Sequence, residues 1–176
     1  MTGETGGVRA AESPFASAEL SPCGRYRYAL HRRWASGPEL ALVGCNPSTA
    51  DASDDDATIR VCMRLARSHG FGGLWVVNAY AWRSRDPAQL RQVDDPVGPE
   101  CDAYLARVVA EVSSRGGTIL MAWGARVATG RADRVCDAVL AASGGQVPVC
   151  LGLTRSGEPR HPLYVAAGTR WMPYRR

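Results

Sequence analysis

Residues 42–60, LVGCNPSTADASDDDATIR, decide how the chain folds. They begin inside a mostly apolar run, residues 39–43, that is typical of a buried strand, and the run breaks at Gly44 into a polar loop. A helix signal follows the loop, with Thr58 or one of the preceding aspartates able to cap it. Because open α/β sheets bind ligands in loops at the carboxyl ends of their strands, we expect this loop to belong to a site. The alternative is that its Gly, Asn and Pro residues only make a turn.

Three more strand-like runs follow, and helix signals separate them. The runs cover residues 74–77, 118–123 and 147–151, and the helices cover residues 56–69, 99–114 and 125–142. Right-handed crossovers place such helices on both faces of a parallel sheet. We therefore expect an α/β domain of three layers with a four-stranded, mainly parallel sheet. Residues 26–34 alternate in polarity, which predicts an antiparallel strand at the edge of this sheet.

Composition places the chain among ordinary globular proteins. It has 176 residues, 45% hydrophobic and 22% charged, which suits a single domain. We assign this domain to residues 18–176 and expect residues 1–17, which are rich in Gly, Ala, Glu and Ser, to be flexible. Because no apolar run approaches the ~20 residues of a membrane span and no signal-peptide core is visible, we expect a cytoplasmic monomer without a membrane partner. The net charge of +4 permits a polyanionic partner.

Six cysteines are scattered along the chain without a CxxC pair. Zinc sites and Fe–S clusters use closer spacings, so we expect no metal and no cofactor, and we interpret the cysteines as free thiols. Only Cys45 lies in the expected site, and a catalytic role for it would need a partner base. The chain contains Arg but no Lys, which excludes a Schiff base on a Lys side chain.

The loops after the four expected strands share one edge of the predicted sheet. They bring Asn46, Asn78, Trp123 with Gly124, and His161 toward one another. The loops contain no G-x-S-x-G elbow, no P-loop and no GxGxxG turn. Two amides and an imidazole therefore predict a polar pocket that holds a heterocycle and orients a water molecule.

Four segments resemble, in order, the motifs of the uracil-DNA glycosylase superfamily. GCNP at 44–47 is similar to its water-positioning motif, and LWVVN at 74–78 to the strand whose last Asn reads the base. MAWGA at 121–125 is similar to its Trp-Gly strand end, and HPLY at 161–164 to its closing His-Pro motif. Residues 26–164 also resemble an uncharacterised bacterial family with an NPSTAD…DDxTI run.

The resemblance implies a uracil-DNA glycosylase-like fold and hydrolysis of the N-glycosidic bond of a modified base in nucleic acid, DNA rather than RNA. It implies that His161 donates to the departing base, that Asn78 reads the base edge and that Asn46 orients the water. Asp55 or Asp56 would accept the proton, unless these aspartates only form a solvated cap cluster. The other residues expected at the base or sugar are Gly44, Cys45, Ser48, Thr49, Trp123, Gly124 and Tyr164. Those expected at phosphates, unless they are ordinary surface residues, are Arg83, Arg85, Arg155 and Arg160.

The sequence departs from the superfamily at two places. Ser48 and Thr49 stand where the glycosylases usually carry Tyr or Gly, and Leu163 replaces the Ser that follows His-Pro and grips a DNA phosphate. An acidic run at residues 51–56 also lies beside the expected site. These features leave two alternatives open, which are the same hydrolysis on a free nucleotide or nucleoside, and binding of a modified base without catalysis.

Overall fold

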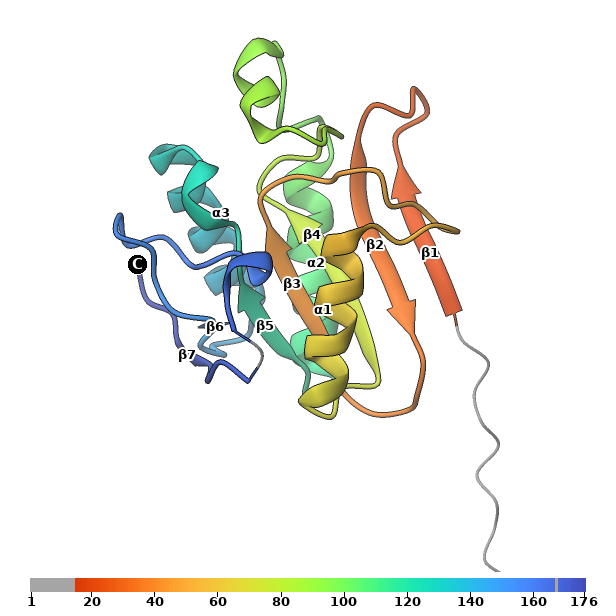
Figure 1. The fold of residues 1–176 in the computed structure, drawn as a ribbon, viewed down its shortest axis with the longest axis vertical. Coiled ribbons are helices and arrows are strands. Elements are labelled where there is room, and N and C mark those ends of the chain that lie inside the picture. Colours follow the sequence, from red (N-terminus) through yellow and green to blue (C-terminus); the bar gives the residue numbers. More distant parts are fainter. Residues whose placement is uncertain (1–14, 167) are drawn as a thin grey trace, which may run out of the picture.

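The computed structural model describes residues 15–166 and 168–176. The segment expected to be flexible, residues 1–17, lies mostly outside this range. Its last three residues, 15–17, instead start the first strand, β1 (Phe15–Leu20). Figure 1 shows one sheet with helices packed around it, so the α/β class is confirmed.

The sheet has seven strands in the order β1-β2-β4-β3-β5-β6-β7. After β1 these are β2 (Arg27–Arg33), β3 (Glu39–Gly44), β4 (Gly73–Asn78), β5 (Thr118–Met121), β6 (Val149–Cys150) and β7 (Met172–Pro173). The neighbours β4, β3, β5 and β6 run parallel and correspond to the strand-like runs of the sequence, whereas β1, β2 and β7 pair antiparallel. The expectation of a four-stranded, mainly parallel sheet is therefore wrong, because the sheet is mixed and has seven strands.

The additional strands carry weak sequence signals. β1 is mostly exposed, and β7 consists of two exposed residues. Main-chain hydrogen bonds to a neighbouring strand, rather than an apolar alternation, recruit both to the sheet. β2, which was expected at the edge, lies between β1 and β4, and all but its last residue are buried.

Alternate residues of β3 face the two helical layers. Leu40 and Leu42 belong to the core beneath α1 (Ala57–Ser68). Ala41 and Val43 belong to the core beneath the other two helices, α2 (Cys101–Ser114) and α3 (Thr129–Ala142). All residues of β3 are buried because both layers cover it (Figure 1). Three short 3₁₀ turns lie in the loops: η1 (Pro87–Gln92), η2 (Gly124–Arg126) and η3 (Pro162–Tyr164).

The strand order places a crevice at the carboxyl ends of β3 and β5. These strands are neighbours in the sheet, but the loop after β3 leads to α1 on one face and the loop after β5 leads to α3 on the other. Such a divergence of loops is where open α/β sheets bind ligands. Within residues 15–166 and 168–176, no helix combines the length and apolar character that crossing a membrane requires.

Asp56 ends the acidic loop and caps α1, since its side chain accepts a hydrogen bond from the main-chain N–H of Ile59 at 2.9 Å. We expect Asp56→Ala to lower the free energy of unfolding by about 1 kcal/mol because the cap is lost. Asp56→Asn keeps the acceptor, so it should stay within about 0.5 kcal/mol of wild type. Urea denaturation followed by circular dichroism measures the difference. Equal losses in the Ala and Asn variants would show that the charge, and not the cap, supports the helix.

Candidate functional site

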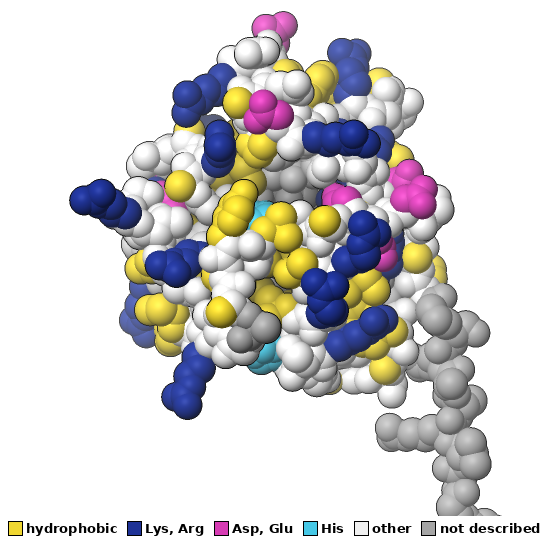
Figure 2. All heavy atoms as spheres, in the orientation of Figure 1, with side chains coloured by type: hydrophobic (Ala, Val, Ile, Leu, Met, Phe, Trp, Pro, Cys, Tyr) yellow, Lys and Arg dark blue, Asp and Glu magenta, His cyan; other side chains and the backbone are white. Residues whose placement is uncertain are grey.

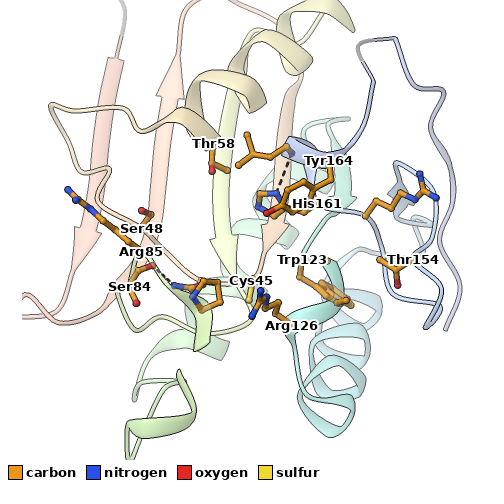
Figure 3. A pocket seen from close by; sticks show the side chains of 16 residues that line it. Cys45, Ser48, Thr58, Ser84, Arg85, Trp123, Arg126, Thr154, His161 and Tyr164 are labelled. Atoms are coloured by element: carbon orange, nitrogen blue, oxygen red, sulfur yellow. Dashed lines mark hydrogen bonds between the residues drawn. The ribbon is translucent and has the colours of Figure 1, made fainter. Parts of the chain in front are cut away.

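A cavity of about 590 Å³ opens at the carboxyl ends of β3 and β5. The loops after β3, β4 and β5 and residues 154–164 form its walls (Figure 3). The predicted site residues that line it are Cys45, Asn46, Ser48, Arg85, Trp123, Gly124, Arg160, His161 and Tyr164. Figure 2 shows basic side chains around a hollow on this face of the molecule. A cavity of this size suits a small organic ligand.

A second cavity, of about 50 Å³, adjoins the first. Both cavities share Asn46 and His161 among their lining residues. The small cavity is also lined by the predicted residues Gly44, Asp56 and Asn78. The structure thus brings both amides and the imidazole together, although the side chains come from segments far apart in the chain.

The side chain of Asn46 is fixed in orientation. Its Nδ2 donates to the main-chain carbonyls of Pro47 at 3.0 Å and Ser84 at 2.9 Å. Both partners are acceptors, so the nitrogen must face them and Oδ1 remains an acceptor for a ligand or a water molecule. The main-chain N–H of Ser84 also donates to the carbonyl of Pro47 at 2.8 Å. These bonds connect the loop after β3 to the loop after β4.

His161 presents a donor to the cavity. Its Nδ1 accepts a hydrogen bond from the main-chain N–H of Leu163 at 3.3 Å, which places the proton of the neutral ring on Nε2. Burial lowers the pKa of His161 below its usual 6.5, and the nearby Asp56 carboxylate offsets this only in part. The ring is therefore mostly neutral at pH 7, and its Nε2–H has no hydrogen-bond partner within residues 15–166 and 168–176. Tyr164 lies next to it at the rim, with 81% of the residue exposed.

Asn78 ends β4 directly opposite Gly44 in the parallel pair. A Cβ at position 44 would lie 2.7 Å from Asn78 Oδ1, so only glycine leaves room for the amide. Asn78 is 5% exposed, and its Nδ2 has no hydrogen-bond partner among the described residues. A buried amide nitrogen without a partner is costly, and a ligand in the small cavity would supply one.

The two candidate aspartates have structural partners. Asp55 forms an ion pair with Arg32 at 2.9 Å and lines neither cavity. Asp56 caps α1, as the alternative interpretation held, but it also lines the small cavity. Between the two, only Asp56 lies where it could accept a proton at the site.

Cys45 is not suited to act as a nucleophile. It is 7% exposed, and burial raises the pKa of its thiol to about 12. The thiol is therefore neutral at pH 7 and forms part of the cavity wall.

The arginines predicted at phosphates divide into two pairs. Arg85 and Arg160 line the large cavity, where Arg126, which the sequence patterns did not single out, joins them. Arg83 instead bonds the carbonyls of Gly24 and Thr49, and neither Arg155 nor Thr49 lines either cavity. Other unpredicted lining residues are Thr58, Ser84, Thr154 and Leu163. Thr58 and Leu163 lie within the quoted motifs but were not assigned to the pocket, whereas Ser84 and Thr154 lie outside the motifs and join the site through the way the loops fold.

Trp123 forms a rigid wall. It is 1% exposed, and its Nε1 donates to Glu158 Oε2 at 2.7 Å. Arg176 in turn donates to both carboxylate oxygens of Glu158, at 2.8 and 2.9 Å. Gly124 follows with a φ of +73°, a left-handed conformation that favours glycine and sends the chain into η2.

Arg27 is the buried site residue that sequence analysis missed. It starts β2, and because β2 runs antiparallel to β4, this first residue lies at the same edge as the carboxyl end of β4. Its main-chain N–H donates to the carbonyl of Ala81, just beyond Asn78. An Arg in a strand of alternating polarity is expected to face solvent. Its burial becomes evident only from the packing of other segments on both faces of β2.

Within the part of the chain that the structure describes, no group of three or more His, Cys, Asp or Glu side chains could hold a metal ion. The family model described as "Protein of unknown function (DUF1643)" matches residues 27–163. The chain belongs to this family, and the match extends from Arg27 across the whole site to Leu163. Neither the curated proteins nor the solved structures contain a significant match.

Trp123 and Asn78 should respond differently to truncation. Trp123→Ala removes a large buried side chain and leaves Glu158 without one partner, so we expect it to lower the free energy of unfolding by about 3–5 kcal/mol. Asn78→Ala removes an amide nitrogen that has no hydrogen-bond partner among the described residues, so the melting temperature should stay nearly unchanged. Differential scanning calorimetry of both variants tests this. An Asn78→Ala protein that unfolds near room temperature would make the amide a structural support of the loop.

The cysteines should differ in reactivity. Cys23 is exposed, and hydrogen bonding to the Ser21 side chain, followed by Arg25, lowers the pKa of its thiol to about 7. Alkylation with iodoacetamide at pH 7.5 should therefore label Cys23 first and Cys45 only after unfolding. Peptide mass spectrometry reads the label, and Cys23→Ser is the control. Rapid labelling of Cys45 in the folded protein would contradict its burial.

Proposed function

We propose that this member of the DUF1643 family hydrolyses the N-glycosidic bond between a base and its sugar. The observation that carries the proposal is a neutral imidazole donor, His161, in the same cavity as the fixed amide of Asn46. The resemblance of the four loop motifs to those of uracil-DNA glycosylases supports the same reaction class.

The reaction needs a donor at the leaving base. As the N-glycosidic bond breaks, the sugar becomes oxocarbenium-like and negative charge grows on the base. His161 Nε2–H is free to donate to an oxygen of the base, and Nδ1 is occupied by the N–H of Leu163. A donor held in place before the reaction stabilises this charge without reorganisation.

The reaction also needs a positioned water molecule. Asn46 Oδ1 is the free acceptor of a side chain whose Nδ2 is held by two carbonyls, so it can orient a water molecule beneath the sugar. An amide does not accept the proton that the attacking water loses. In the proposal Asp56, through the carboxylate oxygen that does not cap α1, takes that proton.

The substrate class follows from the basic rim. Arg85, Arg126 and Arg160 line the large cavity and are suited to bind phosphates of nucleic acid. A base in a duplex would first have to leave the stack, at a cost of a few kcal/mol. The alternative substrate is a free nucleotide or nucleoside. The acidic loop that precedes α1, with the partly exposed Asp51 and the exposed Asp54, would repel such a monomer less than a long polyanion.

The test is incubation of the protein with a panel of modified oligonucleotides, nucleotides and nucleosides, with released bases detected by mass spectrometry. Release from oligonucleotides alone would support the nucleic-acid substrate, and release from monomers alone would support the alternative. Ligand binding without release of any base would leave a binding protein and overturn the hydrolase proposal.

His161→Ala should keep the fold and reduce the rate of base release about 10²–10³-fold, the usual effect of removing one such donor. His69→Ala is the matched control, because His69 is an exposed histidine at the end of α1, away from both cavities. Single-turnover kinetics on a substrate from the panel measures the loss. A wild-type rate in His161→Ala would remove this residue from the mechanism.

The pH dependence follows from the lowered pKa of His161. The neutral form, which carries the Nε2–H donor with Nδ1 as acceptor, predominates at every pH above that lowered pKa. As the pH falls through 6.5, the rate should therefore not rise. A rate that increases as the pH falls through 6.5, and that does so only when His161 is present, would indicate an imidazolium acid instead.

A further inference from the structure

Arg27 is a buried cation without a counterion. It is 2% exposed. The one hydrogen bond of its guanidinium to a described residue runs from Nη1 to the carbonyl of Ala50 at 2.7 Å. Its Nε is buried and has no partner among residues 15–166 and 168–176. No carboxylate in that part of the chain forms an ion pair with it.

Other buried arginines of this chain are paired. Arg32, 6% exposed, binds the carboxylate of Asp55, and Arg131, 8% exposed, binds that of Asp102. Burial of a guanidinium is unfavourable unless a partner compensates it. Burial lowers the pKa of Arg27 to about 10, and the Asp56 carboxylate offsets this only in part. Arg27 therefore lacks the compensation that Arg32 and Arg131 have.

The unused edge of Arg27 has a defined shape. With Nη1 occupied, Nε–H and Nη2–H remain, and these two donors lie side by side in the plane of the guanidinium. This fork matches the two oxygens of a carboxylate. Asn78 Nδ2 is a second buried donor without a partner, and both residues line the cavity of about 50 Å³.

The size of the small cavity limits what enters it. At about 50 Å³ it is much smaller than the adjoining cavity of about 590 Å³, so it suits a substituent or an edge of a ligand rather than a whole base. The ring of a base would remain in the large cavity beside His161, which lines both. Only one edge or substituent of the ring would reach Arg27.

We propose that Arg27 and Asn78 form a subsite that binds a planar, anionic group with two oxygen acceptors on the heterocyclic ligand. This group is a carboxylate substituent on the ring, because its two oxygens lie as close together as the two donors of the fork. The identity of the ligand as a base rests on the proposed function, but binding to the subsite does not require catalysis.

Isothermal titration calorimetry with three free pyrimidines tests the subsite. Orotate carries a carboxylate, uracil has an uncharged dioxo edge, and cytosine has an amino group in place of one oxygen. We expect orotate to bind more tightly than uracil and cytosine, and Arg27→Gln to weaken the binding of orotate about 10- to 100-fold, as expected for loss of hydrogen bonds from a charged group. A preference for orotate that disappears in Arg27→Gln supports the subsite. Equal binding of orotate and uracil, binding of orotate that is unchanged in Arg27→Gln, or no binding of orotate overturns it. Inorganic phosphate that competes with orotate at equal affinity also overturns it.

Thermal denaturation separates a ligand-binding role from a structural one. Arg27→Met removes an unpaired buried charge, so it should melt at or above the wild-type temperature. Arg131→Met is the matched control, because it breaks a buried pair with Asp102 and should melt at a lower temperature. Equal loss of melting temperature in both variants would make Arg27 a structural residue. If Arg27→Met does not fold, the Arg27→Lys variant keeps the test decisive. It retains the charge but not the fork of donors, so it should bind orotate with an affinity between those of wild type and Arg27→Gln.

The outcomes also separate this subsite from the hydrolase proposal. Binding of orotate that depends on Arg27, in a protein that releases no base from any substrate, would leave the subsite and remove the hydrolase. Base release that continues unchanged in Arg27→Gln, together with unchanged binding of orotate, would leave the hydrolase and remove the subsite.

Discussion

The parallel pairing of β3 with β4, in which Gly44 lies opposite Asn78, is the constraint on which the site depends. A side chain at position 44 would collide with the amide of Asn78, so the absence of a Cβ allows the two loops to leave the sheet side by side. Asn46 then joins these loops through its hydrogen bonds to the carbonyls of Pro47 and Ser84. A slip of one residue in this register would turn each side chain of β4 to the opposite face and separate the two amides.

Buried polar groups with hydrogen-bond partners belong to the scaffold of this protein, whereas buried polar groups without partners can mark a site for a ligand. Glu39 in β3 accepts hydrogen bonds from His31 and from Trp75 Nε1, and Glu158 accepts from Trp123 and Arg176. These groups support the scaffold, and their hydrogen-bonding capacity is used within the protein. Buried polar atoms without a partner among the described residues also occur away from the site, at Trp171 Nε1 and at Tyr174, which lines a separate cavity, but Arg27 and Asn78 are the ones that line the small cavity beside His161. A buried polar group without a hydrogen-bond partner destabilises the protein, and such groups are expected where a ligand supplies the missing partner.

The site combines a rigid wall with an exposed rim. Trp123 is held by Glu158 on one side of the large cavity, whereas Tyr164 extends into solvent beside His161 (Figure 3). The neutral imidazole, the fixed amide and the basic rim suit a ligand with a polar heterocycle and a phosphate. A cysteine nucleophile does not fit this arrangement, because burial keeps the thiol of Cys45 protonated at neutral pH. The site therefore offers a hydrogen-bond donor, His161, and a fixed acceptor, Asn46, which are the two groups that the proposed hydrolysis requires.

The sequence by itself determined the α/β class, the parallel centre of the sheet and the edge at which Asn46, Asn78 and His161 meet. It could do so because apolar runs mark buried strands, and parallel strands end at a common edge. Tertiary structure decided the rest. β1 and β7 join the sheet through main-chain bonding to a neighbour, Asp55 forms an ion pair with Arg32, and Arg27 is buried where its guanidinium contacts Ala50 in the loop after β3. Each of these depends on which distant segment becomes a neighbour, and local patterns of polarity carry no information about that choice.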